Sequence, residues 1–250
     1  MSKSAMTQRI AEASPRFRAR MAGVFYFLTS LAYVFGELFV LGKLVVQGDA
    51  TATANNILAH QPLFRLGFAA AIISVACSIV MTVLFYDLFK PVNRSLSLLA
   101  AFFHLVGLAI AAFGSLFQLA PLVVLGGGQY LSVFKVEQLQ ALAYMFLELN
   151  AQAWNAFLLF FGFYCVLIGY LIFRSTFLPR IVGALMALAG VGWLTFLSKP
   201  LADYMYPYNL LPSALGETSL MLWLLVIGVN AQRWKEQASA ARSSDEQVGS

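Results

Sequence analysis

The chain has 250 residues, a formal net charge of +5, 60% hydrophobic residues and only 11% charged residues. An average soluble protein carries roughly a quarter charged residues. Because so few charges do not cover a water-exposed surface, the composition excludes an ordinary soluble domain and predicts an integral membrane protein. The basic residues lie in the gaps between apolar runs and form no single patch, which argues against a nucleic-acid partner.

Long apolar segments predict how often the chain crosses the membrane. A spanning helix needs about 20 mainly apolar residues. Six segments meet this requirement, over residues 22–44, 63–88, 96–119, 151–173, 181–197 and 212–229. The third is expected to end before Pro121, because proline does not continue a helix without losing a hydrogen bond. The sequence therefore predicts an all-α, polytopic bundle of six transmembrane helices.

The placement of lysine and arginine predicts the orientation of this bundle. Twelve of the 16 basic residues fall on one side of the predicted spans, and the other side holds only Lys43, Arg65, Lys135 and Lys199. Basic residues are enriched on the cytoplasmic side, so both termini are expected there. The chain then divides into a basic tail over residues 1–20, a transmembrane domain over 21–230, and a polar tail over 231–250 that is expected to be disordered.

Two of the outer loops are expected to carry short helices at the membrane interface. Residues 49–58 begin with Asp49 ahead of a helix-forming run, which is typical of a helix N-cap. Residues 132–149 predict a second helix that leads into the fourth span. In the fifth span, Gly183 and Ala187 form a pattern of two small residues four apart, which indicates close helix packing.

Polar and ionisable side chains inside a span are costly and therefore mark candidate functional positions. Helical spacing places Tyr33 and Glu37 on one face of the first span. In the same way, Glu148 shares one face with Gln152 and Asn155 of the fourth span. Charges from four predicted helices fall at a similar depth near the outer side. We predict an outward-facing polar chamber lined by Tyr33, Glu37, Arg65, Gln118, Glu148, Gln152, Asn155 and Glu217. The alternative is that one or two buried ion pairs, such as Glu37 with Arg65, hold the helices together.

His104 lies near the middle of the third span and is the one histidine within a predicted helix. We expect a packing role for this side chain, and the alternative is a proton relay. A zinc site needs about three suitable ligands, and a bis-histidine haem needs a second buried histidine. The sequence therefore predicts no metal site and no cofactor.

Several short segments resemble one family. They are Gly36–Val40 with Lys43–Val46 and Gly48–Ala50, then Leu63–Phe68, Pro91–Leu96, Leu178–Gly183 and Gly216–Glu217. Over roughly residues 18–230 the chain is similar to the bacterial membrane-protein family catalogued as domain of unknown function 4386. The resemblance implies six spans and a bacterial inner membrane, and it implies no activity.

Three functions stay open at this point. The first is a non-enzymatic protein that binds or moves a small amphiphile or cation through the polar chamber, where Glu37 and Glu217 supply negative charge and Arg65 balances it. The second is an intramembrane enzyme acting on lipid or isoprenoid substrates, with one of these carboxylates as general base. The third is a structural or partner-binding subunit. We take the first as the working hypothesis. Its partners are the lipid bilayer and the ligand, and the sequence identifies no protein partner.

Overall fold

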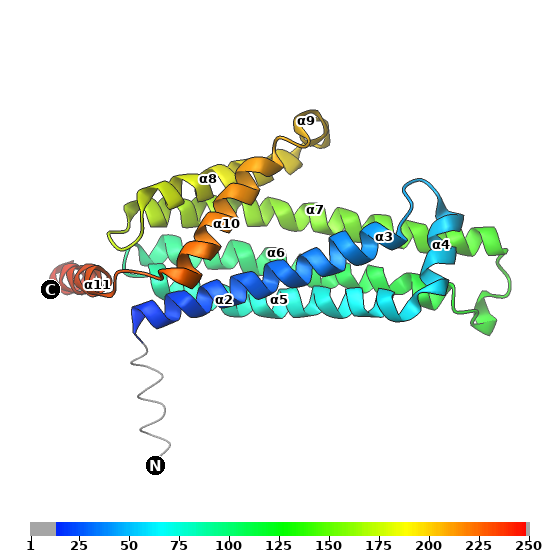
Figure 1. Ribbon diagram of the computed structural model, residues 1–250, viewed down its shortest axis with the longest axis horizontal. Coiled ribbons are helices and arrows are strands. Elements are labelled where there is room, and N and C mark those ends of the chain that lie inside the picture. The colour runs from blue at the N-terminus through cyan, green and yellow to red at the C-terminus, as the bar shows by residue number, and fades with distance from the viewer. Residues whose placement is uncertain (1–13, 249–250) are drawn as a thin grey trace, which may run out of the picture. The chain divides into compact units, whose positions relative to one another are not determined.

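A computed structural model describes residues 14–248, and in this range the chain forms helices and no strand. The helices are α2 (Pro15–Tyr33), α3 (Gly42–Leu44), α4 (Ala50–Ala59), α5 (Gln61–Phe89), α6 (Arg94–Val124), α7 (Val136–Arg174), α8 (Arg180–Leu194), α9 (Lys199–Met205), α10 (Leu210–Val226) and α11 (Ala231–Val248). A π-helical segment, η1 (Val34–Leu41), joins α2 to α3, and two 3₁₀ turns are η2 (Gln129–Leu131) and η3 (Thr195–Leu197). The all-α prediction is confirmed (Figure 1).

The helices match the predicted spans in approximate position, and five of the six predicted spans are helices long and apolar enough to cross a membrane. By length and composition, five are able to cross a bilayer: Pro15–Leu44, Gln61–Phe89, Arg94–Val124, Val136–Arg174 and Arg180–Leu197. The sixth predicted span corresponds to α10, which has 17 residues. It qualifies only together with α11, which follows after a bend of 103°. The described residues therefore contain five candidate spans, or six if α10 and α11 count as one bent span.

The third span ends later than the sequence predicts. Helix α6 does not stop before Pro121 but passes through it and ends at Val124. A proline removes one backbone donor, and Pro121 lies within the last turn of the helix, where this loss interrupts little. The helix still closes beyond it, because Leu125 N donates to Pro121 O at 2.8 Å.

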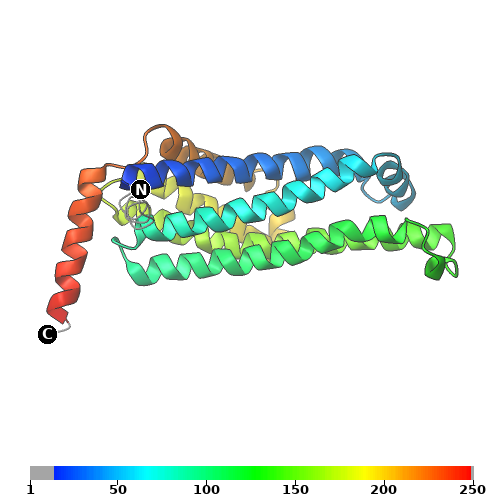
Figure 2. The ribbon, with the colours of Figure 1, turned by 90° about the horizontal axis from the view of Figure 1, so that it is seen from below.

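Both ends of the chain are more helical than their composition predicts. The tail expected to be disordered forms α11 over Ala231–Val248, and this expectation was wrong for those residues. Trp234 Nε1 donates to Leu88 O at 2.9 Å, and Thr176 N donates to Gln237 Oε1 at 3.1 Å, so the first turns of α11 are fixed by tertiary hydrogen bonds. Figure 2 shows α11 as the red helix that leads to the C-terminus. At the other end, α2 begins at Pro15, inside the predicted basic tail. Residues 1–13 of that tail lie outside the described range.

The two predicted loop helices are present. Asp49 caps α4, because its Oδ1 accepts a hydrogen bond from Ala52 N at 2.8 Å. The helix expected over residues 132–149 begins at Val136 and continues without a break to Arg174 as the 39-residue α7. The prediction that this segment leads into the fourth span is therefore confirmed.

The chain divides into two compact units. Among the described residues, unit 1 comprises residues 14–26, 80–105 and 159–248, and unit 2 comprises residues 27–79 and 106–158. Each unit is built from pieces of several helices, so the predicted polar residues are divided between them: Glu217 and His104 belong to unit 1, and the other predicted residues belong to unit 2.

In unit 1, helices α7, α8 and α10 pack closely through small residues. A Cβ on Gly169 of α7 would lie 2.5 Å from Ala187 N and 2.7 Å from Gly183 O of α8, so the two backbones are in direct contact. The close packing predicted from Gly183 and Ala187 is thus confirmed. Helix α10 packs along α8, and Figure 1 shows the two side by side. A Cβ on Gly216 of α10 would meet Leu185 O.

In unit 2, an apolar core joins the π-helical segment to the helices around it. The buried side chains of this core are Val40, Leu44, Ile57, Phe64 and Leu147. A Cβ on Gly36 would lie 3.1 Å from Gly67 O, which shows how closely η1 approaches α5. Unit 2 therefore holds the π-helical segment, and with it Glu37, against a packed surface.

Candidate functional site

The best-defined polar site in unit 1 is the carboxylate of Glu217. Trp193 Nε1 of α8 donates to its Oε1 at 2.6 Å, and Tyr26 Oη of α2 donates to its Oε2 at 3.1 Å. Each carboxylate oxygen thus has one neutral donor. Among the side chains that the structure describes, no lysine or arginine forms an ion pair with Glu217. The carboxylate is therefore oriented by hydrogen bonds without being neutralised by a protein cation.

Aromatic rings from several helices surround these donors. The Tyr26 ring meets Phe85 edge to face with centroids 6.3 Å apart, and Phe85 meets Tyr164 in the same way at 6.4 Å. Phe161 lies 6.4 Å from Trp193 and 5.8 Å from Tyr164. We call the group formed by Tyr26, Phe85, His104, Phe161, Tyr164, Trp193 and Glu217 the Glu217 cluster. Helices α2, α5, α6, α7, α8 and α10 each contribute to it.

His104 joins the Glu217 cluster from α6. Its side chain is 1% exposed, and its Nδ1 lies 2.7 Å from Thr82 Oγ1, in a hydrogen bond. The imidazole stacks on Tyr164, with ring centroids 4.3 Å apart and planes 19° apart. The packing role expected from the sequence agrees with this burial. The structure adds that His104 packs against the aromatic rings beside Glu217.

The hydroxyl of Tyr164 is buried, and it has no hydrogen-bond partner among the described residues. A buried polar atom normally has a partner, because leaving it unpaired costs free energy. Tyr164 Oη is therefore an unpaired polar atom among the described residues of the Glu217 cluster.

We expect Tyr164→Phe to leave the free energy of unfolding within about 0.5 kcal/mol of the wild type, because no hydrogen bond to a described residue is lost. Thr82→Val is the matched comparison, since it removes a buried hydroxyl that is bonded to His104, and it should destabilise by about 1–3 kcal/mol. Thermal unfolding in one detergent measures both. Equal losses in the two variants would show that the Tyr164 hydroxyl has a partner after all.

In unit 2, an aromatic contact joins the predicted face of the first span to α7. Tyr33 stacks on Trp154 of α7 with centroids 4.7 Å apart and planes 13° apart. Glu148 and Gln152 on the same helix are exposed. Helical spacing places these two residues and Asn155 on a different side of α7 from Trp154. The contact therefore joins Tyr33 to α7 without involving the face predicted for the fourth span.

Glu37 lies within the π-helical segment η1 and is half-buried. Arg65 on α5 is exposed, and neither side chain forms an ion pair with a described residue. The alternative of a Glu37–Arg65 ion pair therefore does not describe this structure. Gln118 of α6 is 1% exposed, and its Nε2 has no partner among the described residues.

Sequence reasoning missed two features of these sites. Trp193 was not selected, although an indole N–H near the end of an apolar span needs an acceptor. The π-helical segment was not predicted, and π-helical turns frequently occur at functional sites. Of the predicted chamber residues, unit 2 holds all but Glu217, and the Tyr33–Trp154 contact joins the helices that carry Tyr33 and Asn155. Glu217 lies in unit 1 with different partners, so the single chamber stays a prediction.

Comparison with known proteins adds a family and a distant relative. The sequence model of a family described as "Domain of unknown function (DUF4386)" matches residues 21–228. A protein of Archaeoglobus fulgidus described as "Uncharacterized protein" is 24% identical over 159 residues, which is 62% of this chain and 78% of that protein. No solved structure matches the chain.

Proposed function

Since the chain belongs to the family described as Domain of unknown function (DUF4386), whose description names no activity, we propose its function from its own geometry. The protein binds a small amphiphilic cation within the membrane, and Glu217 supplies the counter-charge. We further propose that the protein lies in a bacterial inner membrane, which it crosses six times with both termini in the cytoplasm. The bias of twelve basic residues against four supports that orientation.

The observation that carries the proposal is the pairing of Glu217 with two neutral donors. An ionised carboxylate in an apolar environment is costly unless a cation or several hydrogen bonds compensate it. The bonds from Trp193 and Tyr26 hold both oxygens in fixed directions. They supply no positive charge, so a cationic ligand completes the electrostatic balance of the site.

The surrounding side chains favour an organic cation over a metal ion. Ca²⁺ takes six to eight oxygen ligands, and Mg²⁺ also requires a full oxygen shell, whereas Glu217 stands among aromatic rings. The faces of tryptophan and tyrosine attract organic cations through cation–π interactions. Tyr26, Trp193 and Phe161 thus fit a cation that carries apolar or aromatic groups.

The polar face of unit 2 supports binding of the same class of ligand. Glu37 and Glu148 add negative charge to that unit, and both lack an ion-pair partner among the described residues. The aromatic pair Tyr33–Trp154 belongs to the same unit. We propose that these residues of unit 2 form an outward-facing polar binding surface of their own, with Gln118, Gln152 and Asn155 as polar contacts.

Direct binding of tetraphenylphosphonium to the purified full-length protein tests this proposal. We expect saturable binding by isothermal titration calorimetry, and Glu217→Gln should weaken it about tenfold or more because the counter-charge is removed. Glutamine still accepts the hydrogen bond from Trp193, so the variant should fold, and its thermal unfolding midpoint verifies this.

Two controls make the outcome specific. Glu137→Gln removes an exposed carboxylate from the first turn of α7, outside the proposed site, and should change the affinity by no more than about twofold, since an exposed charge contributes little. Triphenylphosphine oxide, a neutral compound of similar shape, should bind the wild type and Glu217→Gln alike. If the cation binds a folded Glu217→Gln protein as tightly as the wild type, the proposal is wrong.

A further inference from the structure

A basic cavity lies in unit 1 where α11 passes the turn between α5 and α6. It has a volume of about 300 Å³, and its wall includes Tyr86, Lys90, Pro91, Arg94, Trp234 and Arg242. We propose that this cavity binds the phosphate headgroup of an anionic phospholipid. The site is separate from the Glu217 cluster in its residues, and it does not depend on the function proposed above.

The charges in the cavity favour an anion. Lys90 Nζ is paired with Asp87 Oδ1 at 2.6 Å, so these two side chains largely balance each other. Arg94 and Arg242 are exposed, and neither forms an ion pair or a hydrogen bond through its side chain with a described residue. Among the residues that the structure describes, these two guanidinium groups therefore have no anionic partner. Their planar donor geometry matches phosphate oxygens, which they bind through paired hydrogen bonds.

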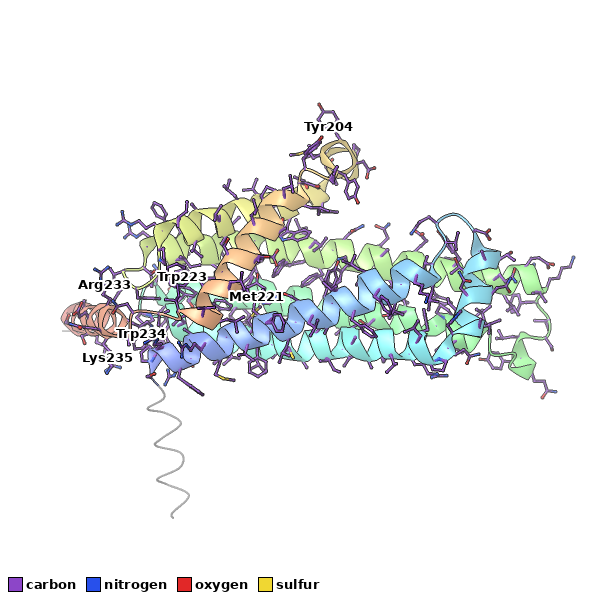
Figure 3. All side chains as sticks on the ribbon, viewed as in Figure 1. Tyr204, Met221, Trp223, Arg233, Trp234 and Lys235 are labelled. Carbon is purple, nitrogen blue, oxygen red and sulfur yellow. The ribbon has the colours of Figure 1, made fainter. Side chains whose placement is uncertain are left out.

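Trp234 supports placing the cavity at the level of a membrane interface. Its Nε1 donates to Leu88 O, the backbone carbonyl near the end of the apolar helix α5, at 2.9 Å. Tryptophan is enriched where headgroups meet the hydrocarbon layer. Helix α11 begins after the bend of 103° that follows α10, so it does not continue the direction of that span. Figure 3 labels Trp234 beside Lys235 on this helix.

The surface next to Arg94 is suited to an acyl chain, which a free phosphate does not have. Leu98 and Phe102 follow Arg94 at steps of four residues, so all three lie on one face of α6. Leu98 is 43% exposed and Phe102 is 57% exposed. A lipid whose phosphate binds Arg94 therefore has an exposed apolar track leading away from the cavity along the same helix.

Native mass spectrometry of the detergent-solubilised protein with added lipid tests the inference. We expect phosphatidylglycerol to bind in preference to phosphatidylcholine. Arg242→Gln should weaken phosphatidylglycerol binding about fivefold, and the double variant Arg94→Gln/Arg242→Gln about thirtyfold, since each juxtamembrane cation contributes substantially to binding anionic lipid. Lys235→Gln removes the same charge from an exposed position of α11 outside the cavity, and it should stay within about twofold of the wild type.

Three results would overturn the proposal. The wild type has no headgroup-specific site if it binds both lipids equally. The attraction is a general effect of surface charge if Lys235→Gln weakens binding as much as Arg242→Gln does. The site takes a free anion if soluble glycerol 3-phosphate displaces the lipid at concentrations similar to those of the lipid itself. Arg94 and Arg242 are both exposed, so folding of the variants is expected, and circular dichroism verifies it.

Discussion

Gly169→Ala is expected to destabilise the protein by about 3 kcal/mol, because overpacking a close contact forces the surrounding backbone to move. The added Cβ would lie 2.5 Å from Ala187 N and 2.7 Å from Gly183 O. Both atoms belong to the backbone of α8, so no side-chain rotation relieves the contact. The helices α7 and α8 must separate, and this loosens the wall of the Glu217 cluster that Trp193 provides. Unfolding followed by circular dichroism in one detergent measures the loss.

Gly42→Ala is the matched control for this substitution. A Cβ at Gly42 would meet only Glu37 O, at the ordinary contact distance of 3.7 Å. Alanine also has a higher helix propensity than glycine, by about 1 kcal/mol. We therefore expect an unchanged or slightly raised stability. A loss in Gly42→Ala as large as that in Gly169→Ala would mean that the close contact between α7 and α8 is not the cause.

Trp193→Phe should lower the free energy of unfolding by about 2 kcal/mol, the range typical of a hydrogen bond to a charged group. The substitution keeps an aromatic ring against Phe161 but removes the donor that lies 2.6 Å from Glu217 Oε1. Glu217 then retains only the bond from Tyr26. We expect the affinity for tetraphenylphosphonium to fall as well, because the carboxylate loses one of its two positional constraints.

Trp223→Phe provides the comparison on α10 itself. The indole of Trp223 makes no hydrogen bond to a described residue, so the same change of side chain should cost less than about 1 kcal/mol. Tyr26→Phe completes a double-mutant cycle with Trp193→Phe. Because both donors act on one carboxylate, their effects should be non-additive. Strictly additive losses, or equal losses in the two tryptophan variants, would contradict the arrangement described for Glu217.

The sequence predicted those features that depend on local chemistry. Apolar length identified the spans, Asp49 marked the start of α4, and the spacing of Gly183 and Ala187 indicated a close helix contact. The family resemblance is confirmed by the match over residues 21–228. The order of α11 was not predictable from composition, because it depends on the tertiary hydrogen bonds of Trp234 and Gln237.

The candidate site was predictable only in part for a related reason. Glu217 stood out because an ionisable group in a span is costly wherever the helices pack. Its partner Trp193 becomes visible only when the packing of α8 against α10 is known, and no single-helix pattern contains that information. Similarly, the π-helical turn around Glu37 has no signature in the apolar periodicity of the first span.

The anchoring of α11 has a consequence for how the protein is best produced. Its polar composition invites truncation after Asn230 to obtain a shorter chain for crystallisation. Such a truncation would remove the indole donor from Leu88 O and the amide acceptor from Thr176 N. It would also take away one wall of the basic cavity. An affinity tag is therefore better placed after α11, where it leaves these contacts intact.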